Sequence, residues 1–418
     1  MIVAGSNHRI INNSYLNWAG RAGLAYRLSD KMVVRAGYGR FYDMWGAVSQ
    51  LSQNFGGNWP AVATINNNAL NQNAIVAPMT DPLGLGGSGG LVYPRISFDK
   101  VSQWMVDPKF KTPYMDQWNF GIQRELPADA VLDVNYVGSV GRRLDWGPVQ
   151  NVAGPGPGDS TPRQPYPYMF PQWFDQSVGS SRYDALQVSF NKRASHDLAF
   201  LLSYTLSRST DDGCSADIGA DCNVQNVYNR AQDTQVSAFN EEHVFSGSFT
   251  VQSPFGKAAS GGNKFVKHLA GGWTLNGILQ LNSGLPFTVT TSNSIPNDGG
   301  FNQERANLIG NPNTGGHTVA QWFNTAAFAN PAPYTFGNSK GNSLIGDWGK
   351  NLDVSLFREF HLGSSETRYF QFRAEAFNVL NDVVFSNPDG YLPDANFGKV
   401  TSQQNVPRQL QLGLKFYF

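Results

Sequence analysis

From Gln409 to its final residue the chain alternates between polar or small side chains and apolar ones. Because successive side chains of a β-strand point to opposite faces of a sheet, this ending predicts a strand with one continuous apolar face. A soluble domain usually ends in a polar, frayed segment. An apolar outer face with a polar inner face is typical of a transmembrane β-barrel strand, and a last strand packed in a soluble sandwich is the alternative. The apolar face holds Leu410, Leu412, Leu414, Phe416 and Phe418, and the other holds Gln409, Gln411, Gly413, Lys415 and Tyr417.

Composition restricts the class of protein further. The 418 residues include 44 glycines and 13% aromatic residues, but only 15% are charged. No segment has the run of about 18 apolar residues that a transmembrane helix needs, so a helical membrane protein is excluded. The 31 basic and 31 acidic residues cancel, so no global charge would attract nucleic acid. One large barrel, or two or three soluble domains, fits this length.

About eleven segments have the length and alternation of membrane-crossing strands, which need roughly 9 to 11 residues. Most come in hairpins whose short connections carry turn-forming residues. The sequence therefore predicts an all-β, antiparallel transmembrane barrel portion. The predicted strands span residues 15–28, 32–42, 116–126, 131–142, 183–193, 198–207, 244–251, 273–281, 352–360, 369–378 and 408–418.

Between the hairpins lie long, irregular connections at residues 43–114, 144–182, 208–242, 282–351 and 379–407. Structureless loops of this size would be unusual in a compact soluble domain. In outer-membrane barrels, short periplasmic turns alternate with longer extracellular loops. The alternation of short and long connections thus favours the barrel.

The strand count gives a parity argument. If the short turns are periplasmic, the first strand begins on the extracellular side, whereas a complete bacterial barrel has an even number of strands. The start of the chain also shows no signal-peptide pattern. We therefore expect that residues 1–418 are the C-terminal part of a longer protein, with about 11 strands of a probable 22-stranded barrel.

Several strings resemble a known family. They are AGLAYRLSDKMVVRAGYGRFYD, YDALQVSFNKRASHDLAFLLSYTLSRSTDD, LNGILQLNSGLPFTV, FNTAAFANPAPYTFGNSKGNSLIGDWGKNLDVSLFREF, FRAEAFNVLND and PRQLQLGLKFYF. In this order and spacing, the chain resembles the C-terminal half of the barrel of a TonB-dependent outer-membrane receptor of the Oar-like group. Full-length members carry an N-terminal carboxypeptidase-regulatory-like domain and a plug, and neither is present in this sequence.

The resemblance implies a location and a set of partners. It implies an outer-membrane receptor that binds a ligand at its extracellular loops and imports it with energy transmitted by TonB. The expected partners are outer-membrane lipid, the plug domain and TonB of the full-length protein, the barrel assembly machinery, and a small-molecule or oligosaccharide ligand. No nucleic acid, metal or cofactor is expected. The alternatives are a passive porin or surface adhesin, and a secreted soluble β-protein that binds glycans.

The only two cysteines, Cys214 and Cys222, lie in an acidic predicted extracellular loop, STDDGCSADIGADC. We expect them to form a disulfide, because an extracellular loop lies in an oxidising compartment. The carboxylates of this loop offer the oxygen ligands that calcium takes, but their spacing fits no EF-hand, so a solvated polar loop is favoured. Zinc is disfavoured because no further ligands have suitable spacing.

Two charged residues and the C-terminal aromatics are further candidates. Arg373 and Glu375 fall on the polar face of a predicted strand, so they are expected to face the lumen and to contact the plug. Pairing with neighbouring strands, for example through Asp353 or Glu359, is the alternative. Phe416 and Phe418 are expected to form a C-terminal assembly signal.

Catalysis is not expected from this sequence. The six histidines are scattered singly, without a nucleophile motif, so the chain is not expected to be an enzyme. His243, at the start of a strand, is interpreted as a structural residue at the membrane rim. Aromatic residues near strand ends are expected to form interfacial girdles. The residues assigned to these girdles are Trp18, Trp118, Tyr204, Trp273, Tyr369 and Phe418.

Overall fold

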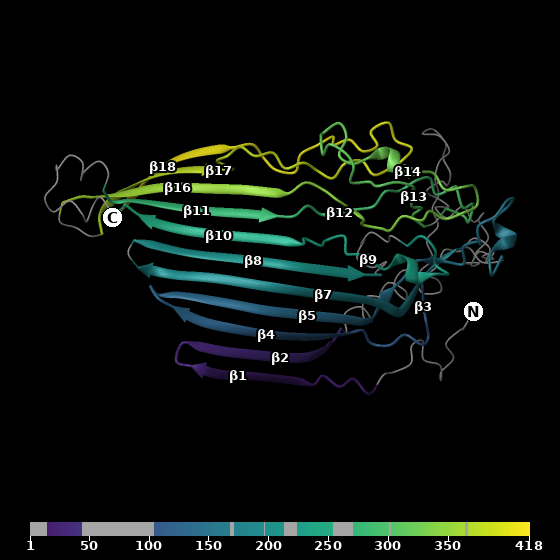
Figure 1. The fold of residues 1–418 in the computed structure, drawn as a ribbon, viewed down its shortest axis with the longest axis horizontal. Coiled ribbons are helices and arrows are strands. Elements are labelled where there is room, and N and C mark those ends of the chain that lie inside the picture. Colours follow the sequence, from purple (N-terminus) through teal and green to yellow (C-terminus); the bar gives the residue numbers. More distant parts are fainter. Residues whose placement is uncertain are drawn as a thin grey trace, which may run out of the picture.

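A computed structural model describes residues 15–43, 104–167, 171–195, 197–212, 224–253, 271–300, 302–363 and 367–418. Eleven long strands in these residues pair, each antiparallel to its neighbours, in the order β1-β2-β4-β5-β7-β8-β10-β11-β16-β17-β18 (Figure 1). These strands are β1 (Arg21–Ser29), β2 (Met32–Tyr42), β4 (Tyr114–Leu126), β5 (Ala130–Trp146), β7 (Gln172–Ser195), β8 (Leu198–Asp211), β10 (His243–Gln252), β11 (Trp273–Asn282), β16 (Gly349–His361), β17 (Tyr369–Phe377) and β18 (Gln409–Tyr417).

Short elements lie in the long connections. They are β3 (Trp104–Val106), β6 (Val149–Gln150), β9 (Gln235–Val236), β12 (Pro286–Phe287), β13 (Asn307–Leu308), β14 (Phe328–Ala329) and β15 (Leu344–Ile345), with 3-10 turns at Thr161–Arg163, Arg230–Asp233 and Thr325–Ala327. No helix in the described part of the chain is long and apolar enough to cross a membrane.

Each of the eleven predicted strands is present, which confirms the all-β fold class. Several strand boundaries were wrong. The first strand begins at Arg21 rather than at residue 15, and much of the predicted loop 144–182 is strand, because β5 continues to Trp146 and β7 begins at Gln172.

The extension of β7 carries no membrane alternation for a physical reason. Its 24 residues span about 80 Å at about 3.3 Å per residue, far more than the apolar band of a membrane barrel requires. At its start β7 pairs with β3 and β6 rather than facing lipid. Asp175 is fully buried there, and Trp146 is 3% exposed. Protein covers this segment, so lipid imposes no period-2 pattern on it.

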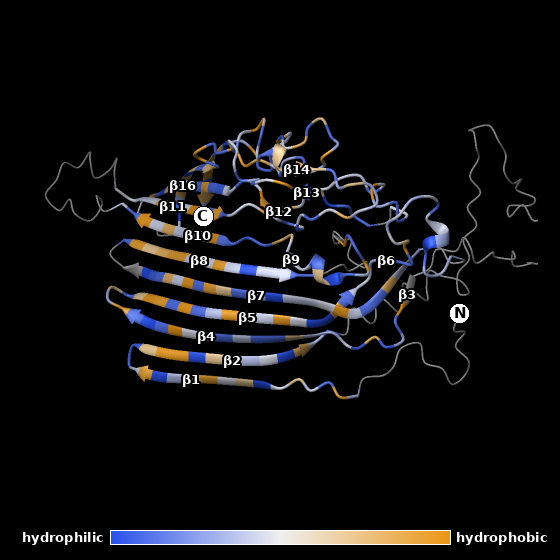
Figure 2. Ribbon diagram, turned by 45° about the vertical axis from the view of Figure 1, so that its right-hand side comes forward, coloured by the Kyte–Doolittle hydropathy of each residue, from blue (hydrophilic) through white to orange (hydrophobic). Residues whose placement is uncertain are grey.

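The strand register separates two faces of the sheet. One cross-strand row contains Ala36, Phe120, Tyr136, Leu186 and Leu206, each paired with the next. The row beside it on the opposite face begins with Gly37, Asn119 and Val137 and ends at Ser207. Figure 2 shows this alternation as orange and blue bands along single strands. The sheet therefore has a mainly apolar face and a mainly polar face.

Among the described residues, short turns join the strands at the left end of Figure 1, and long segments join them at the right end. The short turns use left-handed backbone conformations at Ala128, Asp129, Asp197 and Gly363, with φ of 63°, 57°, 63° and 65°. Such conformations suit tight hairpin connections. The predicted alternation of short and long connections is thus confirmed for the described residues.

The sheet is open, since β1 and β18 end the pairing path. Both end strands present apolar side chains. Leu24 and Tyr26 of β1 are 63% and 60% exposed, and Leu410 and Leu412 of β18 are each 75% exposed.

The main buried apolar cluster lies in the long connections rather than under the sheet. We call residues 147–167, 224–242, 283–300, 302–348 and 378–408 the loop assembly. Its segments interlock through backbone hydrogen bonds, such as Trp322 N–H to Gly398 O and Gln303 N–H to Val224 O. Its core contains Phe287, Val289, Ala306, Trp322, Phe323, Ala327, Phe328, Leu344 and Val400, with Phe385, Leu392 and Phe397 packed against them.

Candidate functional site

Polar side chains form hydrogen-bonded ladders across the polar face of the sheet. Arg35 of β2 donates to Gln123 of β4 over 2.8 Å, and Gln123 donates to Asp133 of β5 over 3.3 Å. Asp133 also accepts from Asn135. Water next to this face could form the further hydrogen bonds of these polar groups, whereas lipid could not.

A second ladder crosses the other half of the sheet. Thr250 of β10 donates to Asn276 of β11 over 2.8 Å, and Asn276 reaches Ser355 of β16 over 3.3 Å. Both ladders lie on the face opposite the apolar rows. The polar face is therefore suited to line an aqueous lumen.

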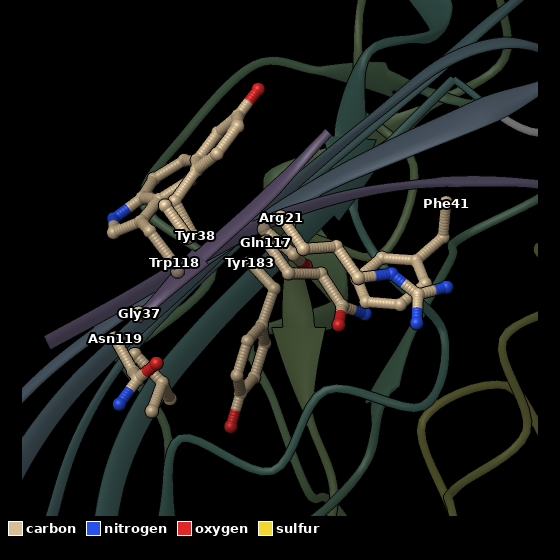
Figure 3. Close-up of a pocket in the computed structure, with 13 residues that line it drawn as sticks. Arg21, Gly37, Tyr38, Phe41, Gln117, Trp118, Asn119 and Tyr183 are labelled. Carbon is tan, nitrogen blue, oxygen red and sulfur yellow. The ribbon is translucent and has the colours of Figure 1, made fainter. Parts of the chain in front are cut away.

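A pocket of about 430 Å³ lies on the polar face of the sheet, which is called the polar wall below, near the end that carries the long connections (Figure 3). Its space depends on Gly37, where a Cβ would lie 2.5 Å from Oδ1 of Asn119. The guanidinium of Arg21 stacks over the Phe41 ring at 4.6 Å. Cationic, amide, phenol and aromatic groups thus surround one concave surface. The side chains that Figure 3 shows around it include Arg21, Phe41, Gln117, Asn119 and Tyr183.

Arg373 and Glu375 lie on the polar face, in register with Phe357 and Ser355 of β16. They form an ion pair with each other, with 2.8 Å between Nη2 of Arg373 and Oε1 of Glu375. The alternative of pairing with Asp353 or Glu359 was wrong. Those two carboxylates have other partners. Asp353 accepts a hydrogen bond from the Asn378 N–H, and Glu359 accepts one from the Gln371 side chain.

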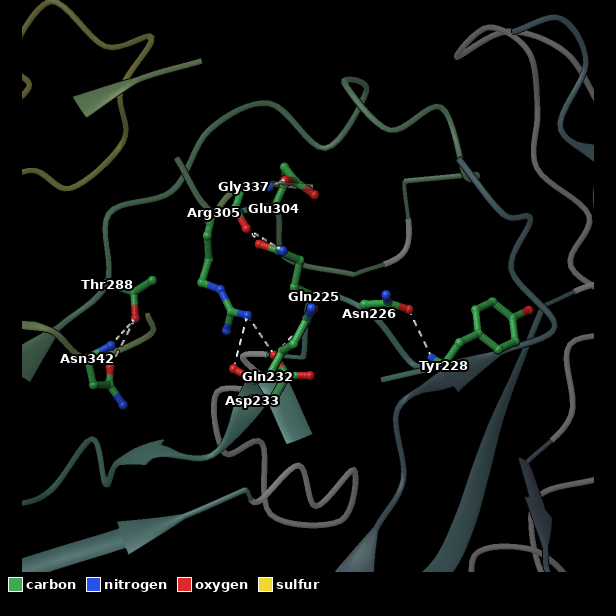
Figure 4. Close-up of polar contacts among 10 residues, drawn as sticks. All are labelled: Gln225, Asn226, Tyr228, Gln232, Asp233, Thr288, Glu304, Arg305, Gly337 and Asn342. Atoms are coloured by element: carbon green, nitrogen blue, oxygen red, sulfur yellow. Dashed lines mark hydrogen bonds and ion pairs between the residues drawn. The ribbon is translucent and has the colours of Figure 1, made fainter. Parts of the chain in front are cut away.

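The loop assembly contains a buried ion pair between Arg305 and Asp233. Nη2 of Arg305 lies 2.9 Å from Oδ1 of Asp233, and both side chains are only 2% exposed. Figure 4 shows the guanidinium pointing at this carboxylate and at the Gln232 carbonyl. Breaking such a pair by removing one partner leaves a buried charge and costs about 3 to 5 kcal/mol.

Gln225 connects this pair to Gly337. Its Oε1 accepts the Arg305 N–H over 3.0 Å, and its Nε2 donates to the Gly337 carbonyl over 2.9 Å. The Gly337 N–H donates to Oε1 of Glu304 over 2.7 Å. Two segments of the loop assembly, at residues 224–242 and 302–348, are thus fixed by one buried polar network.

Burial changes the acidity of two carboxyl groups in the loop assembly. Burial raises the pKa of Glu304 to about 7, although the Gly337 N–H lowers it in part. Burial also raises the pKa of Asp298, and the nearby charge of Asp298 adds to the rise at Glu304. Protonation of Glu304 therefore falls within the neutral pH range.

The acidic cysteine loop lies mostly outside the described residues, which omit 213–223 and hence Cys214 and Cys222. The described Asp212 is 4% exposed and is held by Arg230 and by the Ser180 N–H. It is therefore a structural residue of the loop base. In the part of the chain that the structure describes, no group of three or more His, Cys, Asp or Glu side chains is placed to hold a metal ion.

The aromatic candidates divide between the two faces. His243 stacks against Trp348 at 5.8 Å and shares a 2.8 Å hydrogen bond with the Tyr204 hydroxyl, on the apolar face. Tyr369 was assigned wrongly to an interfacial girdle. Its register partner is Tyr417, and the two rings stack at 4.5 Å on the polar face.

The C-terminal aromatics lie on the apolar face at the turn end. Phe416 packs against Phe370 of β17 with ring centroids 4.8 Å apart. Phe418 stacks on Phe416 at 5.9 Å but is 93% exposed. Phe418 therefore contributes little packing to this chain and is available to another surface.

Sequence reasoning missed Asp233, Glu304 and Arg305. One signal was present: Glu304 and Arg305 are the only Asp, Glu, Lys or Arg residues between Asp298 and Lys340. An adjacent acid and base in a long uncharged segment is a candidate for a buried network, because burial requires a partner.

Comparisons with known proteins place the chain in a family. A family model described as an outer membrane beta barrel domain matches residues 1–411. No curated protein matches the chain.

Solved structures of outer-membrane proteins match the chain at low identity. The outer membrane transporter YddB from Escherichia coli is 12% identical, with a TM-score of 0.45, covering 93% of this chain and 39% of that one. The pyoverdine receptor FpvA from Pseudomonas aeruginosa is 9% identical, with a TM-score of 0.44, and the match covers 96% of this chain and 36% of FpvA. The ferric preacinetobactin receptor BauA from Acinetobacter baumannii is 10% identical, with a TM-score of 0.43 and coverage of 96% and 36%. The chain spans less than half of the length of each of these structures.

The open sheet, its apolar and polar faces, and the family match agree, and they exclude the secreted soluble alternative. The chain belongs to the outer membrane beta-barrel domain family, and it lies in the cell outer membrane.

Proposed function

We propose that this chain forms the C-terminal part of an outer-membrane receptor, which binds a ligand at the loop assembly and the polar wall and imports it with energy transmitted by TonB. The observation that carries the proposal is the interlocked loop assembly at one end of a polar wall. Its buried network, centred on Arg305 and Asp233, fixes two of the long connections, at residues 224–242 and 302–348, in one arrangement. A fixed arrangement of loops is what selective binding requires, because it reduces the entropy lost when a ligand is ordered.

The ligand class follows from the side chains of the wall. The pocket of Figure 3 offers a guanidinium at Arg21, amides at Gln117 and Asn119, and a phenol at Tyr183. These groups donate several hydrogen bonds and stack against flat or ring-shaped groups. We propose a polar small molecule or an oligosaccharide rather than a hydrophobic compound.

The rest of the receptor would complete the barrel. The end strands β1 and β18 leave backbone groups unpaired, and each unpaired group in lipid costs several kcal/mol. We propose that residues 1–418 join a further set of strands, giving about 22 in total, and that a plug fills the lumen. Arg373, Glu375 and Lys415 would face the plug, because their register places them on the polar face.

The proposal is tested with the full-length protein in two assays. Purified TonB C-terminal domain is expected to bind the purified protein in surface plasmon resonance. Proteoliposomes are expected to stay closed to arabinose in a swelling assay, because a plug blocks the lumen. A protein that admits arabinose and does not bind TonB would be a passive porin, and one that neither binds TonB nor admits arabinose would be an adhesin. Either result would contradict the proposal.

A further inference from the structure

A cluster of arginines lies on the apolar, lipid-facing side of the sheet, near its loop end. We infer that this cluster binds the phosphate groups of anionic lipid headgroups in the outer leaflet. The cluster spans the adjacent strands β2, β4, β5, β7 and β8. It contains Arg40, Asp116, Arg142, Arg143, Arg182, Asp184 and Arg208, and is called the arginine rim below.

The register places the arginine rim on the outward face. Arg40 pairs with Asp116 and lies two residues beyond Tyr38, which belongs to the apolar rows. Arg208 is the partner of Asp184 and lies two residues beyond Leu206. Side chains two residues apart share a face of a strand. These arginines therefore point away from the polar wall.

The rim begins next to Tyr38 and Tyr136 of the apolar rows. The Tyr38 hydroxyl donates to Asp116 over 2.8 Å, and the Tyr136 hydroxyl donates to Asp184 over 2.6 Å. Tyrosine rings with their hydroxyls turned toward the polar side mark the boundary between hydrocarbon and headgroups. The arginines beyond this boundary lie at the depth of the headgroups, on the side of the long loops.

The two carboxylates of the rim are already engaged. Asp116 accepts two hydrogen bonds from Arg40, at 2.8 and 2.9 Å, and Asp184 accepts from Arg182 at 2.6 Å. Five arginines against two aspartates leave a net charge of +3 on this surface. Phosphate is the complementary partner, because a guanidinium matches its oxygens in a bidentate geometry.

Three arginines remain available for such a partner. Within the described residues, Arg142, Arg143 and Arg208 form no ion pair, and all three are exposed. Arg143 is held in place by stacking, with its guanidinium 5.3 Å from the Tyr114 ring, and Arg40 stacks on the same ring at 4.4 Å. The shared ring keeps two guanidinium groups at one site on the outward surface.

The inference depends on the membrane placement of the chain and not on transport. It is tested on the full-length protein in detergent micelles, by measuring the affinity for three probes: lipid A with both phosphates, lipid A stripped of both phosphates, and inorganic phosphate. The double variant Arg142→Gln and Arg208→Gln is expected to bind intact lipid A about 25-fold more weakly, from about 5-fold for each arginine removed. Stripped lipid A should bind weakly to wild type and variant alike, and excess inorganic phosphate should not displace intact lipid A.

Arg124→Gln is the matched control. Arg124 is also exposed and outward-facing, but it lies at the turn end of β4, so its replacement should leave lipid A binding unchanged. Heat-modifiable mobility should be the same in all variants and shows that each has folded. The proposal is overturned if the double variant binds lipid A like wild type, if Arg124→Gln weakens binding equally, or if stripped lipid A binds as tightly as intact lipid A. Displacement by inorganic phosphate would assign the rim to soluble anions and would also overturn it.

Discussion

Glutamine at position 304 is expected to stabilise the loop assembly at alkaline pH. The Glu304 side chain is only 2% exposed, and its carboxyl accepts the Gly337 N–H. Burial raises its pKa to about 7 from 4.5. Ionised Glu304 therefore destabilises the folded loop assembly by about 3 kcal/mol relative to a locally unfolded state in which water reaches the carboxylate. Glutamine keeps the acceptor for Gly337 and removes the charge.

The sign of the pH dependence follows from the raised pKa. A group whose pKa is higher in the folded state contributes stability that is complete below its unfolded pKa and is lost as pH rises through the folded value. Opening of the wild-type assembly should therefore become easier between pH 5 and pH 8. The Glu304→Gln variant should change much less over this window, with a remaining slope of the same sign from Asp298, whose pKa is also raised.

Hydrogen exchange measures this opening locally. At pH 8, amides of residues 302–348 should exchange roughly 100-fold more slowly in the Glu304→Gln variant than in wild type, from the 3 kcal/mol above. At pH 5 the two proteins should be nearly equal, and comparing them at one pH cancels the intrinsic exchange chemistry. Glu242→Gln, at an exposed position, is the control and should match wild type. Identical pH dependence in wild type and Glu304→Gln would refute the reasoning.

Further predictions concern assembly and loop packing. Phe418→Asp should impair outer-membrane insertion of the full-length protein while costing only about 1 kcal/mol in place, and unchanged heat-modifiable mobility and membrane fractionation would contradict this. Non-reducing mass spectrometry should find one bridge between Cys214 and Cys222, stabilising the loop by about 2 to 3 kcal/mol, and two free thiols would exclude it. Gly337→Ala should speed exchange in the loop assembly, because the new Cβ would lie 1.9 Å from the Arg305 carbonyl oxygen, at a cost of about 1 to 3 kcal/mol. Residues 1–418 expressed alone with a signal peptide should aggregate, be degraded or close only as an oligomer, whereas a monomeric, protease-resistant, heat-modifiable barrel would contradict the open-edge argument.

The strands were predictable because the membrane imposes a local rule. Lipid on one face and water on the other force alternation along every crossing segment, so pairs such as Leu186 and Val188 identify β7 without any knowledge of its neighbours. The rule ends where lipid ends. The first residues of β7 are covered by protein, and there the pattern gave a loop instead of a strand.

The loop network was not predictable from local patterns. Asp233 and Arg305 come from different loops, and neither lies in a periodic segment. Their pairing depends on the three-dimensional path of both loops. Turn and strand signals in the sequence do not predict that path. The position of Arg373 and Glu375 on the polar face did follow from strand parity, but their mutual pairing depended on side-chain reach along one strand.

The polar wall combines small residues with a few long charged ones, and this combination has a consequence for the lumen. Gly37 and Gly121 lie on this face, and amide side chains of the neighbouring strands cover them, since a Cβ at Gly37 would lie 2.5 Å from Oδ1 of Asn119 and one at Gly121 would clash with Oδ1 of Asn135. Whatever fills the lumen would therefore meet amide side chains at these glycines. Contacts that distinguish one filling protein from another can come from the charged side chains of this face, such as Arg35, Asp133 and Arg373, each of which is already hydrogen-bonded on the polar face. Because a preorganised polar group needs less ordering when it binds, such side chains can provide specificity without a large contact area.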